Sequence, residues 1–175
     1  MVIIPNKFIF TATPRTGSRA ISEALLRKYP EALSDYPSKH HDHPTTNLEL
    51  PVYTVIRNPL DQLLSWWAHV DIRAGSPRRP LQFAEEYENV MFLPKYEKYR
   101  LNIHADIADK FLLYSNNMYH ITKELDIHDL VRVGRSPSIP ATNTEKAELK
   151  EYIESEFAAD LALWSKVFIE EMLRG

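Results

Sequence analysis

Short apolar runs alternate along the chain with longer stretches in which apolar residues recur at a helical period. The segments 7–13 (KFIFTAT) and 52–56 (VYTVI) are continuous, β-branched and aromatic, which predicts two buried strands. Further strands are predicted near 110–114 and at 130–133. Because helical patterns separate these runs, we expect an α/β fold with a mostly parallel sheet.

The best-marked helix follows the second strand. Asn58 is a suitable cap and Pro59 suits the first helical turn. Its apolar face consists of residues three or four positions apart, namely Leu60, Leu63, Leu64 and Trp67. Other helices are predicted at 18–29, 81–89, 116–125 and 144–174, the last with a break near 157–160. The basic stretch 72–80 is predicted to be a loop that either meets an acidic partner or is solvated surface.

Composition narrows the class of protein. A length of 175 residues predicts a single domain, 1–175. The hydrophobic share of 44% and charged share of 26% are typical of a globular protein. A net charge of −3 argues against a nucleic-acid partner, and the lack of cysteine excludes a thiolate metal site and a cysteine nucleophile. Without a signal-peptide pattern or a long apolar run, we expect a cytoplasmic protein with no membrane partner.

The turn between the first strand and the first helix, TPRTGS, has the chemistry of an anion site. A glycine turn at a helix N-terminus directs several backbone N–H groups at one point. Arg15 adds a permanent cation and Ser18 a hydroxyl group. The Gly-Lys-Ser/Thr of a Walker A loop is absent, which disfavours an ATPase. The alternative is an ordinary strand–turn–helix joint with a surface arginine.

A second polar segment, RNPLDQLLSWW, begins where the second strand ends. Arg57 lies at the carboxyl edge of the predicted sheet, where open α/β folds bind ligands. Ser65 follows eight positions later and falls off the apolar face of the helix. The pair suits a bound phosphate. The alternative is that Arg57 pairs with a nearby acid and Ser65 is merely a helix-surface residue.

Together, TPRTGS and RNPxDxxxSxW resemble the two cofactor motifs of sulfotransferases that use 3′-phosphoadenosine-5′-phosphosulfate (PAPS). The segment 51–67 is most similar to the carbohydrate-modifying, Golgi-type branch of that family. The resemblance implies a three-layer fold, a parallel sheet flanked by helices, of the P-loop-containing nucleoside triphosphate hydrolase type. It also implies in-line transfer of a sulfuryl group from PAPS, with no metal required, to a hydroxyl or amine. The acceptor is a glycan, a small molecule or a polypeptide.

The same resemblance implies residue roles. Arg15 would stabilise charge on the leaving phosphate and the transferring group, beside the backbone N–H groups of the turn. Arg57 and Ser65 would hold the 3′-phosphate, the group that distinguishes PAPS from ATP. The full set of implied cofactor contacts is Arg15, Thr16, Gly17, Ser18, Arg19, Arg57, Ser65 and Arg132.

The stretch KHHDH supplies candidates for the base that takes the acceptor's proton, because a near-neutral pKa suits that role. Family members carry Lys-x-His or His-x-His in this region, which makes His41 the first choice and His43 the second. The histidines are otherwise a metal site with Asp42 or a solvated loop. Glu23 and Glu49 are alternative bases.

Two other functions fit the same motifs. One is a phosphotransferase of related fold, which would require Mg²⁺. The other is a non-catalytic module that binds PAP, the product of PAPS, or another nucleotide without turnover. The number of chains in the active protein is not predicted.

Overall fold

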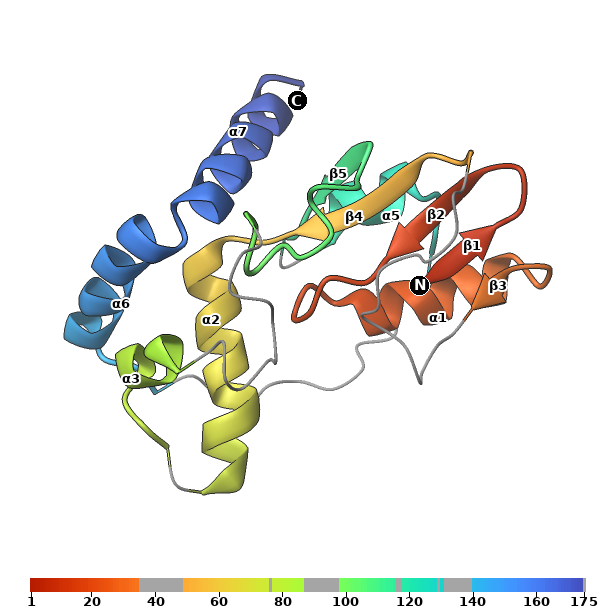
Figure 1. Ribbon diagram of the computed structural model, residues 1–175. Helices are drawn as coiled ribbons and strands as arrows, with labels where there is room; N and C mark the ends of the chain where they lie inside the picture. The colour runs from red at the N-terminus through yellow and green to blue at the C-terminus, as the bar shows by residue number, and fades with distance from the viewer. Residues whose placement is uncertain are drawn as a thin grey trace.

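The computed structural model describes residues 1–34, 49–75, 77–86, 98–115, 118–128, 130 and 140–174 (Figure 1). Its sheet has the strand order β3-β1-β2-β4-β5. The strands are β1 (Val2–Ile4), β2 (Phe8–Thr11), β3 (Leu33–Ser34), β4 (Val52–Ile56) and β5 (Lys110–Leu113). Strands β2, β4 and β5 are parallel, whereas β1 pairs antiparallel with both β2 and β3.

The sheet is therefore mixed, and the prediction of a parallel sheet is wrong at one edge. The apolar run Val2–Ile4 is only three residues long, too short to be predicted as a strand. It nevertheless forms a hairpin with β2 through a turn in which Asn6 has a φ of 60°. Val2 and Ile4 are fully buried in the same core cluster as Phe8 and Phe10, and this burial stabilises the extra strand.

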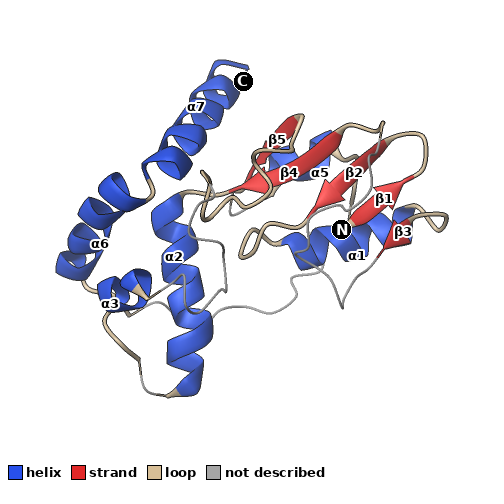
Figure 2. Ribbon diagram, viewed as in Figure 1, coloured by secondary structure: helices blue, strands red, loops and turns tan. Residues whose placement is uncertain are grey.

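Helices lie on both faces of the sheet (Figure 2). They are α1 (Ser18–Lys28), α2 (Pro59–Trp67), η1 (Ala68–Ile72), α3 (Pro80–Glu85), α5 (Tyr119–Glu124), α6 (Asn143–Glu156) and α7 (Ala158–Arg174). Apolar residues of α1 and α5 pack with β1, β2 and β5 in one core cluster. Helix α7 packs against β4 and β5 in another. A third cluster joins α2, α3 and α6 beside the sheet.

Most predicted elements are confirmed. The second strand and the first helix lie where expected, and Asn58 caps α2 by accepting hydrogen bonds from two backbone N–H groups. The predicted C-terminal break falls between α6 and α7. The helix after Pro59 continues further than predicted, because the π-helical segment η1 extends α2. Residues 131–133 of the predicted fourth strand lie outside the described residues.

A buried carboxylate at the start of α7 fixes the segment 100–102. The backbone N–H groups of Arg100, Leu101 and Asn102 donate to Asp160 at 2.9, 3.2 and 2.8 Å, and the Asn102 amide donates at 2.9 Å. Asp160 is 0% exposed, so these donors replace its contact with water. The segment is thereby held where Leu101 can contact α2.

Within the described ranges, no helix combines the length and the apolar composition that crossing a membrane requires.

We predict that Asp160→Ala lowers the free energy of unfolding by about 3 kcal/mol or more, because each unsatisfied buried donor costs about 1–3 kcal/mol. Urea denaturation followed by circular dichroism measures this loss. Glu154→Ala is the matched control, because Glu154 is exposed and its ion pair with Lys150, at 3.9 Å, lies on the surface. This variant should change the free energy of unfolding by no more than about 0.5 kcal/mol. A loss below about 1 kcal/mol for Asp160→Ala contradicts the anchoring role.

Candidate functional site

The parallel half of the sheet brings three chain segments to one edge. The carboxyl ends of β2, β4 and β5 are neighbours, because β4 pairs in parallel with both other strands. The segments that follow are the turn 12–17, Arg57 and Tyr114. The carboxyl edge of such strands is where α/β folds bind ligands.

The turn before α1 has an unusual backbone. Arg15 and Gly17 both adopt left-handed conformations, with φ of 62° and 73°. For a non-glycine residue such as Arg15 this costs roughly 1–2 kcal/mol, and such strain is concentrated at functional sites. The Thr16 hydroxyl donates to the Thr13 carbonyl at 2.7 Å, so its side chain serves the turn itself. Gly17 occupies the N-cap position of α1 and has no side chain to cap the helix N–H groups.

A buried glutamine braces this turn. The Gln62 side-chain amide donates to the Pro14 carbonyl at 2.8 Å and to the Leu101 carbonyl at 3.1 Å. Gln62 is 0% exposed, so both bonds form away from water. The network therefore runs from Asp160 through the segment 100–102 to the turn. Sequence reasoning missed Gln62, because a polar residue between apolar helix positions gives no sign that it is buried.

The two predicted arginines are in contact. Arg57 Nη1 donates to the backbone carbonyl of Arg15 at 2.8 Å, and the Arg57 guanidinium lies 4.5 Å from the centre of the Tyr114 ring. Arg15 Nε donates to the Ser65 hydroxyl at 3.2 Å, and its guanidinium lies 5.8 Å from the Trp66 ring. The structure thus brings Arg15, Arg57 and Ser65 together, although Ser65 contacts Arg15 rather than Arg57. The aromatic partners were not predicted.

The electrostatics of the site favour a bound anion. Burial, together with the charges of Arg57 and Arg73, lowers the pKa of Arg15 to about 10, so it remains a cation at neutral pH. Burial also lowers the pKa of Arg57. Arg57 Nε is buried without a hydrogen-bond partner among the described residues. None of the ion pairs within the described ranges involves Arg19, Arg57 or Arg73. An anion would offset the desolvation of these groups.

Of the other predicted site residues, the structure describes some, and the rest lie outside the described residues. Ser18 is buried at the first turn of α1, and Arg19 is exposed beside it. Glu49 precedes β4 and so lies toward the opposite edge of the sheet from Arg57, which argues against it as the base. The remaining predicted residues, His41, His43 and Arg132, lie outside the described residues.

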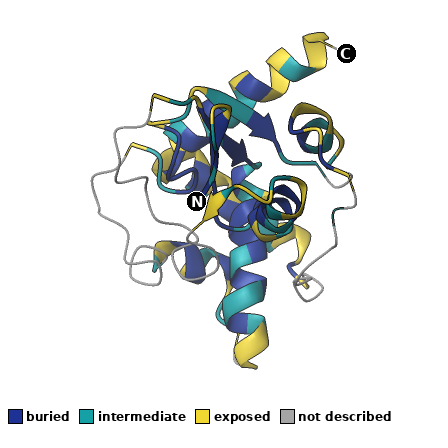
Figure 3. Ribbon diagram, turned by 90° about the vertical axis from the view of Figure 1, so that its right-hand side faces the viewer, coloured by how far each residue is buried: buried dark blue, intermediate teal, exposed yellow. Residues whose placement is uncertain are grey.

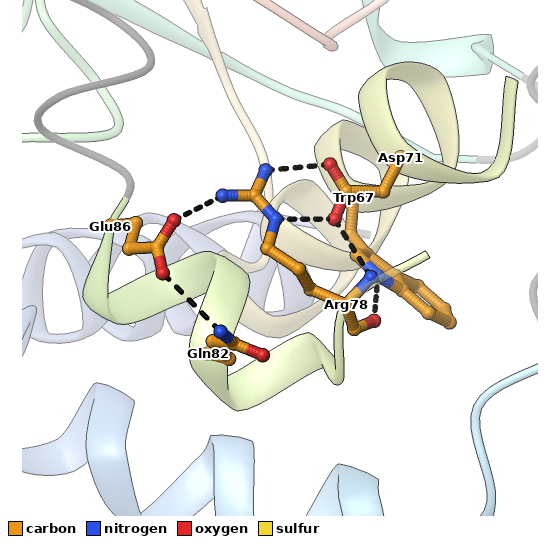
Figure 4. Close-up of polar contacts among 5 residues, drawn as sticks. All are labelled: Trp67, Asp71, Arg78, Gln82 and Glu86. Carbon is orange, nitrogen blue, oxygen red and sulfur yellow. Dashed lines mark hydrogen bonds and ion pairs between the residues drawn. The ribbon is translucent and has the colours of Figure 1, made fainter. Parts of the chain in front are cut away.

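Two of the three arginines in the basic stretch 72–80 form internal ion pairs, and Figure 4 shows those of Arg78. The Arg78 guanidinium donates two hydrogen bonds to the Asp71 carboxylate, at 2.6 and 2.7 Å, and one to Glu86, and the Arg78 backbone N–H donates to Asp71 at 3.1 Å. These bonds lower the pKa of Asp71. The Trp67 indole N–H donates to the Arg78 carbonyl at 2.8 Å, and Arg79 pairs with Glu148 at 2.6 Å. Of the arginines in this stretch, Arg73 alone has no ion pair within the described ranges.

The described residues form a groove away from the arginines and no cluster of metal-ligating side chains. The groove, of about 480 Å³, lies near the starts of β4 and β5, and its lining includes Tyr53, Lys110 and Glu171. Among the described residues, no three His, Cys, Asp or Glu side chains converge where a metal ion would sit.

Comparisons with protein-family models, curated proteins and solved structures find no match to this chain.

We predict that sulfate stabilises the folded protein through this site. A ligand with a dissociation constant of about 1 mM, present at about 20 mM, adds about 2 kcal/mol of stability. That corresponds to a rise of about 3–7 °C in the thermal midpoint relative to chloride at equal ionic strength. Scanning fluorimetry of the wild type and of Arg15→Gln measures the effect, which the variant should lack. Arg79→Gln is the control, because Arg79 lies in an exposed ion pair elsewhere. Equal sulfate effects in all three proteins would indicate general salting-out and contradict the site.

Proposed function

We propose that this protein binds PAPS and transfers its sulfuryl group to a hydroxyl or amine of an acceptor. One observation carries the proposal: the arginines of the two motifs, 42 positions apart, are joined by a 2.8 Å hydrogen bond at the carboxyl edge of parallel strands. The motif resemblance gives each arginine an anionic partner, and the geometry supports one ligand that contacts both. PAPS carries a phosphosulfate and a separate 3′-phosphate, which suits two adjacent cationic positions.

Different residues would hold the two charged groups of the cofactor. The backbone N–H groups of residues 16–18, at the N-terminus of α1, and the Arg15 guanidinium would hold the 5′-phosphosulfate. Arg57 would hold the 3′-phosphate, with Nε available for a further hydrogen bond. Ser65 orients Arg15 by accepting from its Nε, and this contact fixes the direction of the guanidinium. The Tyr114 ring stabilises the Arg57 guanidinium through a cation–π contact.

Catalysis would rest on fixed positive charge and positioning. When bound, PAPS supplies the sulfuryl group and leaves as PAP. Arg15 would supply a cation for the negative charge of the leaving phosphate oxygen, and its held geometry would avoid reorganisation during the reaction. The acceptor's proton passes to a base, for which His41 is the first candidate and His43 the second. The acceptor is a glycan, a small molecule or a polypeptide, and the proposed location is the cytoplasm.

The motif chemistry favours this proposal over a related phosphotransferase. The residue after Gly17 is Ser18, where a Walker A loop has lysine, and the hydroxyl of Thr16 is bonded to the Thr13 carbonyl rather than directed at a metal ion. A PAP-binding module without turnover would use the same two arginines. It is distinguished by tight PAP binding without consumption of PAPS in the presence of acceptors.

We predict that PAP binds at least tenfold more tightly than AMP, without Mg²⁺, in calorimetric titrations. Arg57→Ala should remove most of this preference, because a hydrogen bond to a charged group is worth about 1.5–3 kcal/mol. The readout is the ratio of the two dissociation constants, since loss of the Arg57 bond to the Arg15 carbonyl also loosens the turn.

Arg79→Ala is the control for a lost positive charge and should keep the ratio of the wild type. An equal loss of PAP and AMP affinity in Arg57→Ala would remove the assigned 3′-phosphate role. No preference for PAP in the wild type would overturn the proposed function.

A further inference from the structure

A histidine that sequence reasoning did not single out lies next to Trp66, the aromatic neighbour of Arg15. Its ring is 6.1 Å from the ring of Trp66 in an edge-to-face arrangement, and Trp66 in turn contacts the Arg15 guanidinium. Arg73 Nη1 lies 3.4 Å from Nδ1 of this histidine, His69. Trp66, His69 and Arg73 therefore extend the polar side of the site along α2 and η1, away from the sheet.

The backbone at this position is also unusual. His69 belongs to η1, a π-helical segment directly continuous with α2. Such segments are rare and occur frequently at functional sites. Asp71 is buried against Arg78, whereas Arg73 is exposed directly after η1. In Figure 3 the helix formed by α2 and η1 ends in exposed residues, drawn yellow.

Among the described residues, the charges that lower the pKa of His69 are positive. They come from Arg15 in the turn, Arg19 on α1 and Arg73 on its own helical segment. The nearest carboxylate along η1, Asp71, is held by two hydrogen bonds from the Arg78 guanidinium. Burial and these three arginines hold the pKa of His69 below its usual range, so the ring is neutral at pH 7.

The tautomer follows from the contact with Arg73. A guanidinium only donates hydrogen bonds, so Nδ1 of His69 is the acceptor and Nε2 carries the hydrogen. His69 is thus a neutral N–H donor next to Trp66, which itself contacts Arg15. A ring surrounded by cations is a poor proton acceptor until negative charge arrives, and an anion beside Arg15 supplies that charge.

We propose that His69 is a further anion-contacting residue of this site, and that binding of a sulfate, sulfonate or phosphate group beside Arg15 is coupled to uptake of one proton by His69. The inference rests on the anion site of the proposed function. The inference adds His69 to that site and predicts that the affinity of the site for an anion depends on pH in a defined direction.

The direction follows from linkage. A bound anion stabilises imidazolium, so it raises the pKa of His69 above the value in the free protein. Affinity therefore increases as pH falls through the bound-state value, and it levels off below the free-state value. Arg15, with a pKa of about 10, keeps its charge throughout this range. Inorganic sulfate is the suitable probe, because it stays a dianion there, whereas phosphate esters titrate near a pKa of about 6.

The test is an NMR titration of the full chain with ¹⁵N-labelled imidazoles from pH 5 to 8.5. Spectra are recorded in chloride and in saturating sulfate at equal ionic strength, and His69→Gln assigns the signal. We expect a midpoint below about 6.5 in chloride and a rise of at least about one unit in sulfate. One unit corresponds to sulfate binding about tenfold more tightly at pH 5.5 than at pH 8 in calorimetry.

His69→Gln keeps a side-chain donor but has no titrating group, so it should abolish the pH dependence of sulfate affinity. His128→Gln is the matched control, because the His128 side chain is 83% exposed and pairs with Asp126; it should retain the dependence of the wild type. The inference is overturned if sulfate binds without moving the His69 midpoint, if His69→Gln retains the pH dependence, or if sulfate does not bind.

A PAP titration at pH 8 separates this inference from the proposed function. A shift of His69 by sulfate, together with equal affinities for PAP and AMP, would support the proton-coupled anion site and reject the PAPS assignment. Selective PAP binding with an unmoved His69 midpoint would retain the PAPS assignment and reject the role of His69.

Discussion

The hydrogen bond from Arg57 to the backbone carbonyl of Arg15 is the contact on which the candidate site depends. It exists because β2 and β4 are adjacent and parallel, so the segments after both strands reach the same edge. Gln62 holds the same turn by donating a hydrogen bond to the Pro14 carbonyl. The result is two partly buried guanidiniums at one edge of the sheet, and a bound anion would offset the cost of their burial.

The sequence was sufficient to predict the motif residues and most of the elements that carry them. Arg57 is identified because it directly follows a continuous apolar strand, and strand ends in α/β folds are ligand positions. Arg15 is identified because it lies in a glycine turn between a strand and a helix N-terminus. Gln62 was missed because its role comes from tertiary contacts with Pro14 and Leu101, which leave no periodic pattern. His69 was missed because its local contact with Arg73 gains significance only once the fold brings Arg15 to Trp66. The same holds for Tyr114, which supports Arg57 only once β5 pairs with β4.

The error in the predicted sheet has a local cause and a limited consequence. Strand β1 is too short for its pattern to stand out, and its pairing is fixed by burial of Val2 and Ile4 against α1 rather than by strand propensity. The antiparallel strands β1 and β3 lie on the far side of β2 from β4. The site therefore depends only on the parallel part of the sheet, where the prediction and the structure agree.

The central claim is that one ligand contacts both arginines. The most direct measurement follows the side-chain Nε–H signals of Arg15 and Arg57 in ¹⁵N–¹H spectra during a titration with PAP. The account predicts that both signals shift along one saturation curve with the same midpoint, and that AMP shifts the Arg57 signal far less. Shifts with different midpoints, or an Arg57 signal that PAP does not move, would contradict a shared site.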